Sequence, residues 1–386
     1  MSARTRLFVF AVTAPVIAFA LVGALLGQVW ARETPYANLR VFEEAVSLIA
    51  NNYVEEVNLS KVMRGAMGGL AEGLDPDSAY LPPEAVREVD AGNGVGPADI
   101  GVALTRQYYL RVIAARDGSP AARAGLRAGD FLRVIGERPT REMSVWDGMR
   151  LLRGEPGSTV SLLVIRGNAA DPHPVEITRE IPAAPIVSGR LIGTDVGYLR
   201  IPAFAAGIPA AVSARVAELR KAGASRLVVD VRDVADGPLD AGIATARLFV
   251  ASGTLLHKET KGAGREAVTA GGGAAPIAQP AVVLVNRGTS GAAELFAAAL
   301  AGNKRAELVG ERTHGRAGLQ RLVRLNDGSA MLITNAWYLT PGGEPIHQKG
   351  LTPAHTVEVP DVEFGAPPPA TDPILDKGLE LVKDRK

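Results

Sequence analysis

The chain has 386 residues, 47% of them hydrophobic, so it can form two or three domains with separate cores once the N-terminus is set aside. A formal net charge of +1 provides no strong field to attract nucleic acid, which argues against a nucleic-acid partner. There are no cysteines, which excludes disulfides and thiolate chemistry, and the five histidines lack metal-ligand spacing. We therefore expect no metal and no other cofactor.

The N-terminus has the pattern of a membrane segment. Arg4 and Arg6 precede an uncharged, largely apolar run over 7–31. As a helix, about 25 residues at 1.5 Å each would cross a hydrocarbon layer of roughly 30 Å. The pattern favours a signal anchor over 1–35, with the rest of the chain on the exported, periplasmic side of the inner membrane. Cleavage after Ala31 is the alternative, and it leaves the remainder in the cell envelope as well.

The segment 36–95 has a helical pattern. Apolar residues repeat at three and four positions, first at Phe42, Ala45, Val46, Ile49 and Ala50 and then at Val62, Ala66 and Leu70. The stretch LDPDSAYL at 74–81 is rich in turn-forming residues. We predict two amphipathic helices and a turn, and we assign no reaction to the turn.

The region 96–180 contains two glycine-bearing motifs, SPAARAGLRAGD at 119–130 and LLRGEPGS at 151–158. Both resemble motifs of PDZ domains. Such a domain adds a peptide as a strand along an exposed sheet edge, while loop amides hold the peptide's C-terminal carboxylate. The resemblance implies that 96–180 binds peptide or protein C-termini.

The resemblance also implies where that peptide would lie. The carboxylate-binding loop would consist of Ile100, Gly101 and Val102. The side-chain pocket would be lined by three apolar residues at helical spacing, Val145, Met149 and Leu152. The alternative is that these three are ordinary core residues that face the sheet.

Strand and helix patterns alternate over 181–360. We predict strands near 196–204, 227–232 and 281–285 and helices near 209–221 and 294–300. The Gly/Ala-rich stretch 262–275 is predicted to be a mobile loop, and 361–386 a Pro/Ala linker with a C-terminal helix. The sequence NRGTSG at 286–291 joins a strand to a helix, where free backbone N–H groups can bind an anion or stabilise an oxyanion.

The stretch 281–320 resembles the nucleophile and base region of the carboxyl-terminal processing (tail-specific) peptidases, which are serine proteases with a Ser-Lys dyad. Their pattern is N-x-G-[ST]-A-S-A-[SA]-E, followed by G-E-[KR]-T-[FY]-G-K-G-x-x-Q. The matching positions are Asn286, Gly288, Thr289, Ala292, Glu294, Gly310, Glu311, Thr313, Gly315 and Gln320. The segment 74–81 also resembles the family's L-D-P-H-S-x-Y-L. The resemblance implies an α+β multidomain fold, with an N-terminal helical segment, a PDZ domain and a ClpP/crotonase-like ββα peptidase core.

Two positions depart from the pattern in a way that affects its chemistry. The family's nucleophilic serine falls on Gly291, and its general-base lysine falls on Arg316. A buried lysine can lose its proton, whereas an arginine would need a pKa shift of roughly six units, or about 8 kcal/mol. We therefore expect impaired catalysis, with 288–294 as a plain helix start that Ser290 caps.

The loop that resembles the family's oxyanion loop departs as well. The family has D-L-R-x-N-P-G-G, whereas this chain has DVRDVADG over 230–237. Only Gly237 is kept, and the carboxylate of Asp236 has the wrong charge to stand beside a developing oxyanion. With three catalytic elements altered together, the resemblance implies a pseudoenzyme.

The alternative is an active serine-type endopeptidase that cleaves near protein C-termini. In that reading Ser290, one residue from the expected position, attacks from a re-registered turn. The base would be His314 or a water molecule, and Gln320 would orient the reacting groups. A further possibility is a regulatory role, as a homo-oligomer or bound to an active paralogue.

Overall fold

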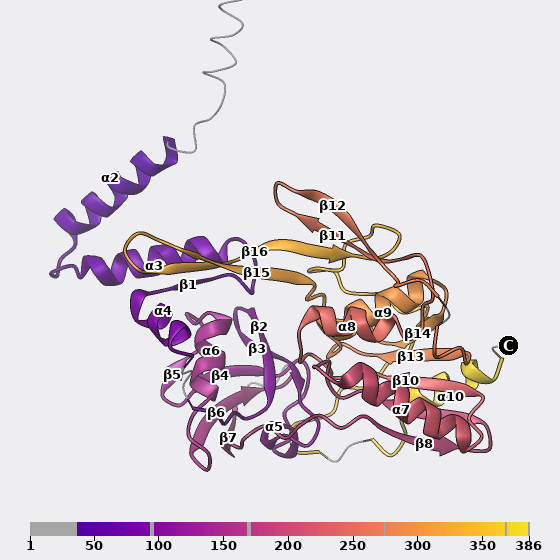
Figure 1. The fold of residues 1–386 in the computed structure, drawn as a ribbon. Coiled ribbons are helices and arrows are strands. Elements are labelled where there is room, and N and C mark those ends of the chain that lie inside the picture. The colour runs from indigo at the N-terminus through magenta and orange to yellow at the C-terminus, as the bar shows by residue number, and fades with distance from the viewer. Residues whose placement is uncertain (1–36, 93–95, 168–170, 274, 367–368, 385–386) are drawn as a thin grey trace, which may run out of the picture. The chain divides into compact units, whose positions relative to one another are not determined.

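A computed structural model describes residues 37–92, 96–167, 171–273, 275–366 and 369–384 (Figure 1). The chain divides into two compact units, 1–65 and 66–386, which are described separately. The predicted signal anchor over 1–35 lies outside the described residues. Within those residues, no helix has the length and apolar character needed to cross a membrane.

The first unit contains α2 (Ala37–Asn52) and the start of α3 (Leu59–Glu72), so the two predicted helices are confirmed. Several apolar side chains of α2 face solvent, among them Leu39, Leu48 and Ile49. The segment 79–90 contains two further elements that were not predicted. A short strand, β1 (Ala79–Leu81), separates α3 from α4 (Pro83–Asp90).

The domain that resembles a PDZ domain contains a six-stranded antiparallel sheet, in which five strands have the order β2-β3-β4-β6-β7 and the short β5 pairs with β4. Its strands are β2 (Val102–Gln107), β3 (Tyr109–Ala115), β4 (Phe131–Ile135), β5 (Arg138–Pro139), β6 (Thr159–Ile165) and β7 (His173–Thr178). Its helices are α5 (Pro120–Arg123) and α6 (Val145–Leu152). Ser144 begins α6 with a capping box, because its hydroxyl accepts from the Asp147 N–H and the Asp147 carboxylate accepts from the Ser144 N–H.

The core domain is built around a six-stranded sheet in the order β17-β14-β13-β10-β9-β8. The strands are β8 (Ser188–Ile192), β9 (Val196–Arg200), β10 (Arg226–Asp230), β13 (Ala281–Val285), β14 (Ala306–Gly310) and β17 (His355–Thr356). All neighbours are parallel except β8 and β9. The central strand β13 is buried along its whole length, as expected for a parallel strand covered on both faces.

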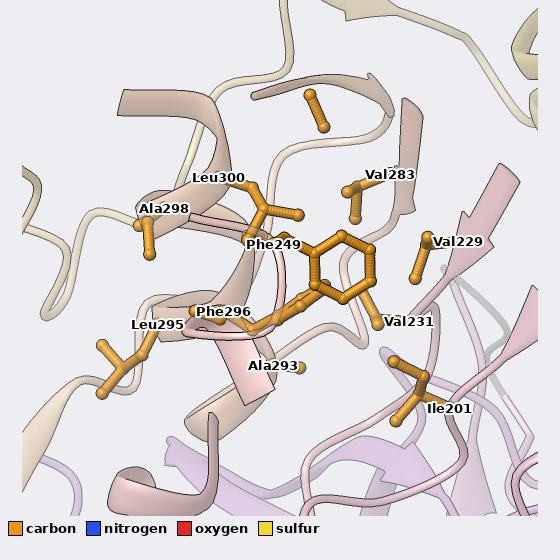
Figure 2. Close-up of a cluster of buried hydrophobic side chains, with 14 of the residues drawn as sticks. Ile201, Val229, Val231, Phe249, Val283, Ala293, Leu295, Phe296, Ala298 and Leu300 are labelled. Atoms are coloured by element: carbon orange, nitrogen blue, oxygen red, sulfur yellow. The ribbon is translucent and has the colours of Figure 1, made fainter. Parts of the chain in front are cut away.

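Helices cover both faces of this sheet. The helices are α7 (Ile208–Lys221), α8 (Leu239–Ala246), α9 (Ala292–Gly302) and α10 (Pro373–Asp384). Along β13, Val283 belongs to the cluster under α7, α8 and α9, whereas Leu284 faces the opposite cluster under α10. Figure 2 shows the larger cluster, where the rings of Phe249 and Phe296 meet edge to face with centroids 5.5 Å apart.

A second sheet of the core domain has the order β1-β16-β11-β12, with β15 also paired to β16. Its remaining strands are β11 (Thr254–Thr260), β12 (Gly264–Thr269), β15 (Gly318–Arg324) and β16 (Ala330–Leu339). The predicted loop over 262–275 is therefore wrong for residues 264–269, which form β12. The physical reason is antiparallel pairing with β11, which the Gly/Ala-rich composition concealed.

Candidate active-site cleft

The turn over 286–291 is tied to the end of β10 by a hydrogen-bond network. The Asn286 side chain donates to the Asp233 carboxylate at 3.0 Å and accepts from the Asp233 N–H at 2.9 Å. The Thr289 hydroxyl donates to the Val231 carbonyl at 3.0 Å. A Cβ at Gly288 would lie 2.3 Å from the Asp233 carboxylate, so the turn accepts only glycine there. The network fixes the backbone that leads into α9.

Gly291 is the N-cap of α9 and has a φ of 62°. The prediction that Ser290 caps this helix is wrong. The reason is that the Glu294 carboxylate reaches back to accept the Gly291 N–H at 3.1 Å, which moves the helix start one residue later. A Cβ at 291 would have its nearest contact at 3.7 Å, from Leu239, so the space for a side chain is present although the φ is strained.

Ser290 is buried and is not among the residues that line the cleft at Gly291. Its residue is 1% exposed, and within the described parts of the chain its hydroxyl has no hydrogen-bond partner. His314 touches this turn through its backbone N–H, which donates to the Thr289 carbonyl at 3.0 Å. Burial, with nearby arginines, lowers the pKa of His314 to about 4, so its imidazole is neutral and weakly basic at pH 7. The geometry gives Ser290 no activating base.

Glu294 joins the turn to the loop that precedes β15. Its buried carboxylate accepts from the Gly291, Gly315 and Arg316 N–H groups at 3.1, 2.6 and 2.7 Å, and from the Thr313 hydroxyl. Burial raises the pKa of Glu294 to about 7, although all four hydrogen bonds act to lower it. Sequence reasoning used Glu294 only as a motif position and missed this role.

Arg316, at the position that resembles the family's lysine, forms an ion pair. Its Nη2 lies 3.1 Å from Oδ1 of Asp77, and the two side chains are 31% and 10% exposed. The Gln320 side chain donates to the Asp77 carbonyl, which brings the predicted orienting residue to the same point. Sequence reasoning assigned Asp77 only to a turn. The available signal was that the family pattern places a histidine at this position.

Asp236 does not project its charge into the cleft. Its carboxylate accepts from Nε of Arg116 at 2.7 Å, and Arg116 also lies 3.3 Å from Asp99 of the PDZ domain. The Asp236 carboxylate is thus paired with a guanidinium, which it shares with Asp99. Gly237 has a φ of 112° and packs against the Phe204 carbonyl, where a Cβ would clash at 1.5 Å.

These elements enclose a cleft of about 420 Å³, here named the Gly291 cleft. Of the predicted residues, it is lined by Gly291, Arg316, Gln320 and Gly237, whereas Ser290 and Asp236 are not among its lining residues. The remaining lining residues are Asp77, Ala235, Pro238, Leu239, Asp240, Gly318, Leu319 and Tyr338. The lining residues that the structure describes thus include no serine, threonine or lysine.

The residues predicted to form the PDZ peptide site lie together, mostly in the domain core. Ile100, Val102, Val145 and Leu152 are buried in one apolar cluster, against which Met149 packs. Gly101 has a φ of 78° and packs on Ser119, where a Cβ would clash at 2.2 Å. No cluster of three or more potential metal ligands occurs among the described residues.

Comparisons with known proteins agree with this architecture. The model of peptidase family S41 matches residues 195–357, and that of the PDZ domain matches residues 111–166. A carboxyl-terminal-processing protease of Picosynechococcus sp. is 33% identical over 315 residues, covering 80% of this chain and 76% of that protein. One from Synechocystis sp. is 34% identical over 277 residues, covering 71% of this chain and 65% of that protein.

A solved structure extends the agreement to three dimensions. The photosystem II D1 C-terminal processing protease superposes with a TM-score of 0.67 at 28% identity, covering 82% of this chain and 92% of that chain. Fold, motifs and sequence identity lead to one assignment, and this chain belongs to the carboxyl-terminal processing protease family, peptidase family S41, with a PDZ domain.

Proposed function

We propose that this chain binds C-terminal segments of peptides or proteins without cleaving them. The observation that carries the proposal is the ion pair between Arg316 and Asp77. A base must be free of its proton to activate a nucleophile, and an arginine side chain keeps its proton at pH 7. With Gly291 also among the lining residues, the cleft supplies neither group of a Ser-Lys dyad.

The scaffold that would hold a peptide is complete. The PDZ domain and its neighbouring clefts are formed, and the PDZ domain and family fit binding of peptide C-termini. Ser290 is the remaining serine near the position of the family nucleophile, and its burial without a hydrogen-bonded base favours binding over the alternative of cleavage.

The test is to incubate the purified chain with unstructured peptides and to follow binding by fluorescence anisotropy and cleavage by mass spectrometry. Binding without new fragments is the expected result. Cleavage that persists through purification but is abolished by Ser290→Ala would establish the active-peptidase alternative and overturn the proposal. An acyl adduct on any serine would do the same.

We further propose that the apolar run over 7–31 anchors the chain, so that the PDZ domain and core work on the exported side of the inner membrane. Membrane fractions that release the chain at alkaline pH would contradict an anchor. A homo-oligomer or a complex with an active paralogue fits a regulatory role, and co-purification from membranes with no peptidase attached would count against the paralogue.

A further inference from the structure

A cavity that shares Asp77 and Arg316 with the Gly291 cleft carries an excess of positive charge. It has a volume of about 820 Å³ and is here named the arginine cavity. The charged lining side chains are Arg106, Arg111, Arg141, Arg316, Glu72, Asp75 and Asp77. Thr105, Gln107, Tyr108, Ser144, His314 and His347 are among its neutral lining residues at pH 7.

The three carboxylates of this cavity are already engaged. Glu72 pairs with Arg106, and Asp77 pairs with Arg316. Asp75 is held inside its own turn, where it accepts from the N–H groups of Asp77 and Ser78 at 2.9 and 2.8 Å. Each of the three carboxylates therefore already interacts with another lining residue or with backbone N–H groups of its own turn.

Two arginines of the cavity have no carboxylate partner within the described part of the chain. Arg111 donates to the Gln107 side-chain oxygen at 2.9 Å, and Arg141 stacks over the Tyr108 ring at 4.6 Å. Burial lowers the pKa of Arg111, and the positive charge of the neighbouring Arg287 lowers it further. Positive potential reaches the neutral wall as well, since Arg316 and Arg111 both lower the pKa of His314.

The position of the cavity connects it to the PDZ domain. Strand β2 is an edge of the PDZ sheet, and its end at Thr105, Arg106 and Gln107 lines the cavity. A peptide added as a strand along β2 would therefore pass this wall. Arginine is the residue best suited to a carboxylate, because its planar donors can bind both oxygens.

We propose that the arginine cavity is a binding site for a carboxylate of the bound peptide, with Arg111 and Arg141 as its ligands. This deepens and rests on the proposed peptide-binding function. The carboxylate is an acidic side chain of the peptide, because the α-carboxylate of a peptide added along β2 would lie at the other end of that strand, beside Ile100, Gly101 and Val102.

The experiment uses the full chain and one unstructured peptide in three forms. The first has a free C-terminus and one glutamate, the second is amidated at the C-terminus, and the third has glutamine in place of glutamate. Affinities are measured by fluorescence anisotropy for the unaltered chain and for Arg111→Gln, Arg141→Gln and the control Arg133→Gln. Arg133 is an exposed residue of β4 outside the cavity lining.

We expect the unaltered chain to bind the glutamine peptide about tenfold more weakly than the first peptide, whereas amidation tests the separate loop at Ile100. Arg111→Gln and Arg141→Gln should each weaken the preferred peptide about tenfold and remove that discrimination, as expected for loss of a charged hydrogen bond. Arg133→Gln should change neither. Equal affinities of all variants for the first peptide would overturn the site while leaving the proposed function intact.

A second measurement needs neither a variant nor a peptide. The pKa of His314 is followed by NMR in chloride and in trifluoroacetate, a carboxylate that stays ionised over the titration, at constant ionic strength, with the histidines of the full chain labelled. A carboxylate bound by Arg111 and Arg141 should raise the pKa of His314 from about 4, because it offsets the positive charges that add to the effect of burial in lowering it. An unchanged pKa in trifluoroacetate would overturn the site. If no peptide binds at all, the proposed function fails, and this titration still decides whether the cavity takes a carboxylate.

Discussion

At the scale of single residues, the chemistry of the Gly291 cleft depends on three positions. Gly291 leaves space for a Cβ, Arg316 carries a guanidinium where the family pattern has lysine, and Asp77 supplies the anion that pairs with it. The Asp77 carboxylate affects the chemistry as well, because a negative charge beside position 316 favours the protonated form of a lysine introduced there. The pair Arg316 and Asp77 is therefore best regarded as one unit.

This unit predicts the outcome of restoring the family residues. Gly291→Ser with Arg316→Lys should remain inactive, because Asp77 keeps the introduced lysine protonated. Adding Asp77→His should give measurable cleavage of unstructured peptides by mass spectrometry. The control combines Gly291→Ala with Arg316→Lys and Asp77→His, and it should cleave no peptide. Equal activity of the double and triple variants would show that Asp77 does not control the proton.

At the scale of elements, Glu294 holds α9, the turn over 286–291 and the loop before β15 in one arrangement. Four donors converge on this carboxylate, three of them backbone N–H groups. Replacement by alanine leaves buried donors without partners, each at a cost of about 1–3 kcal/mol. We expect Glu294→Ala to lower the free energy of unfolding by several kcal/mol, about 3–5, measured by urea denaturation.

Glu294 also predicts a pH dependence of stability. The pKa of Glu294 is about 7 in the folded chain, against an ordinary value of 4.5 for a glutamate. Between these two pH values the folded chain therefore binds more protons at Glu294 than the unfolded chain does. Its contribution is most favourable below about pH 4.5 and is lost as pH rises through 7. Glu294→Gln should remove this component from a urea-unfolding series over pH 4.5–7.5, provided the same series is run on both chains. An unchanged pH slope would contradict it.

At the scale of the 66–386 unit, the PDZ domain is fastened to the core domain by charged and apolar contacts. Arg116 pairs with Asp236 of the oxyanion-like loop, and Arg200 pairs with Asp117 through two contacts of 2.8 Å. Ala235 packs against the face of β2 and β3. The loop over 230–237 thus contacts the PDZ domain through Asp236 and Ala235.

A double-mutant cycle on Arg116→Ala and Asp236→Ala measures this fastening. Both side chains are partly exposed, so we expect a coupling energy of about 0.5–1 kcal/mol in urea unfolding that shrinks at high salt. Arg123 and Glu180, an exposed pair on the PDZ domain, provide the matched control cycle, with a coupling near zero. A coupling at 116 and 236 no larger than that of the control pair would show that the contact does not bind the domains together.

Local patterns in the sequence identified the family, the PDZ motifs, the central strand 281–285 and the helices around it. Such features follow from apolar periodicity and turn chemistry, which neighbouring residues encode. The sequence also exposed the missing hydroxyl at Gly291 and the permanent cation at Arg316, because these depend on residue type alone. It failed where composition hid a paired strand, as in β12.

The tertiary structure decided which charges meet. Asp77 lies 239 positions before Arg316 in the chain, and Asp236 lies 120 positions after Arg116, yet each pair shares an ion contact. Packing between distant segments also buries Ser290 and brings four donors to Glu294. It leaves Arg111 without a carboxylate partner among the described residues. The residue types in the sequence determine which side chains are charged. Whether an opposite charge lies near each of them depends on distances that only the folded chain determines.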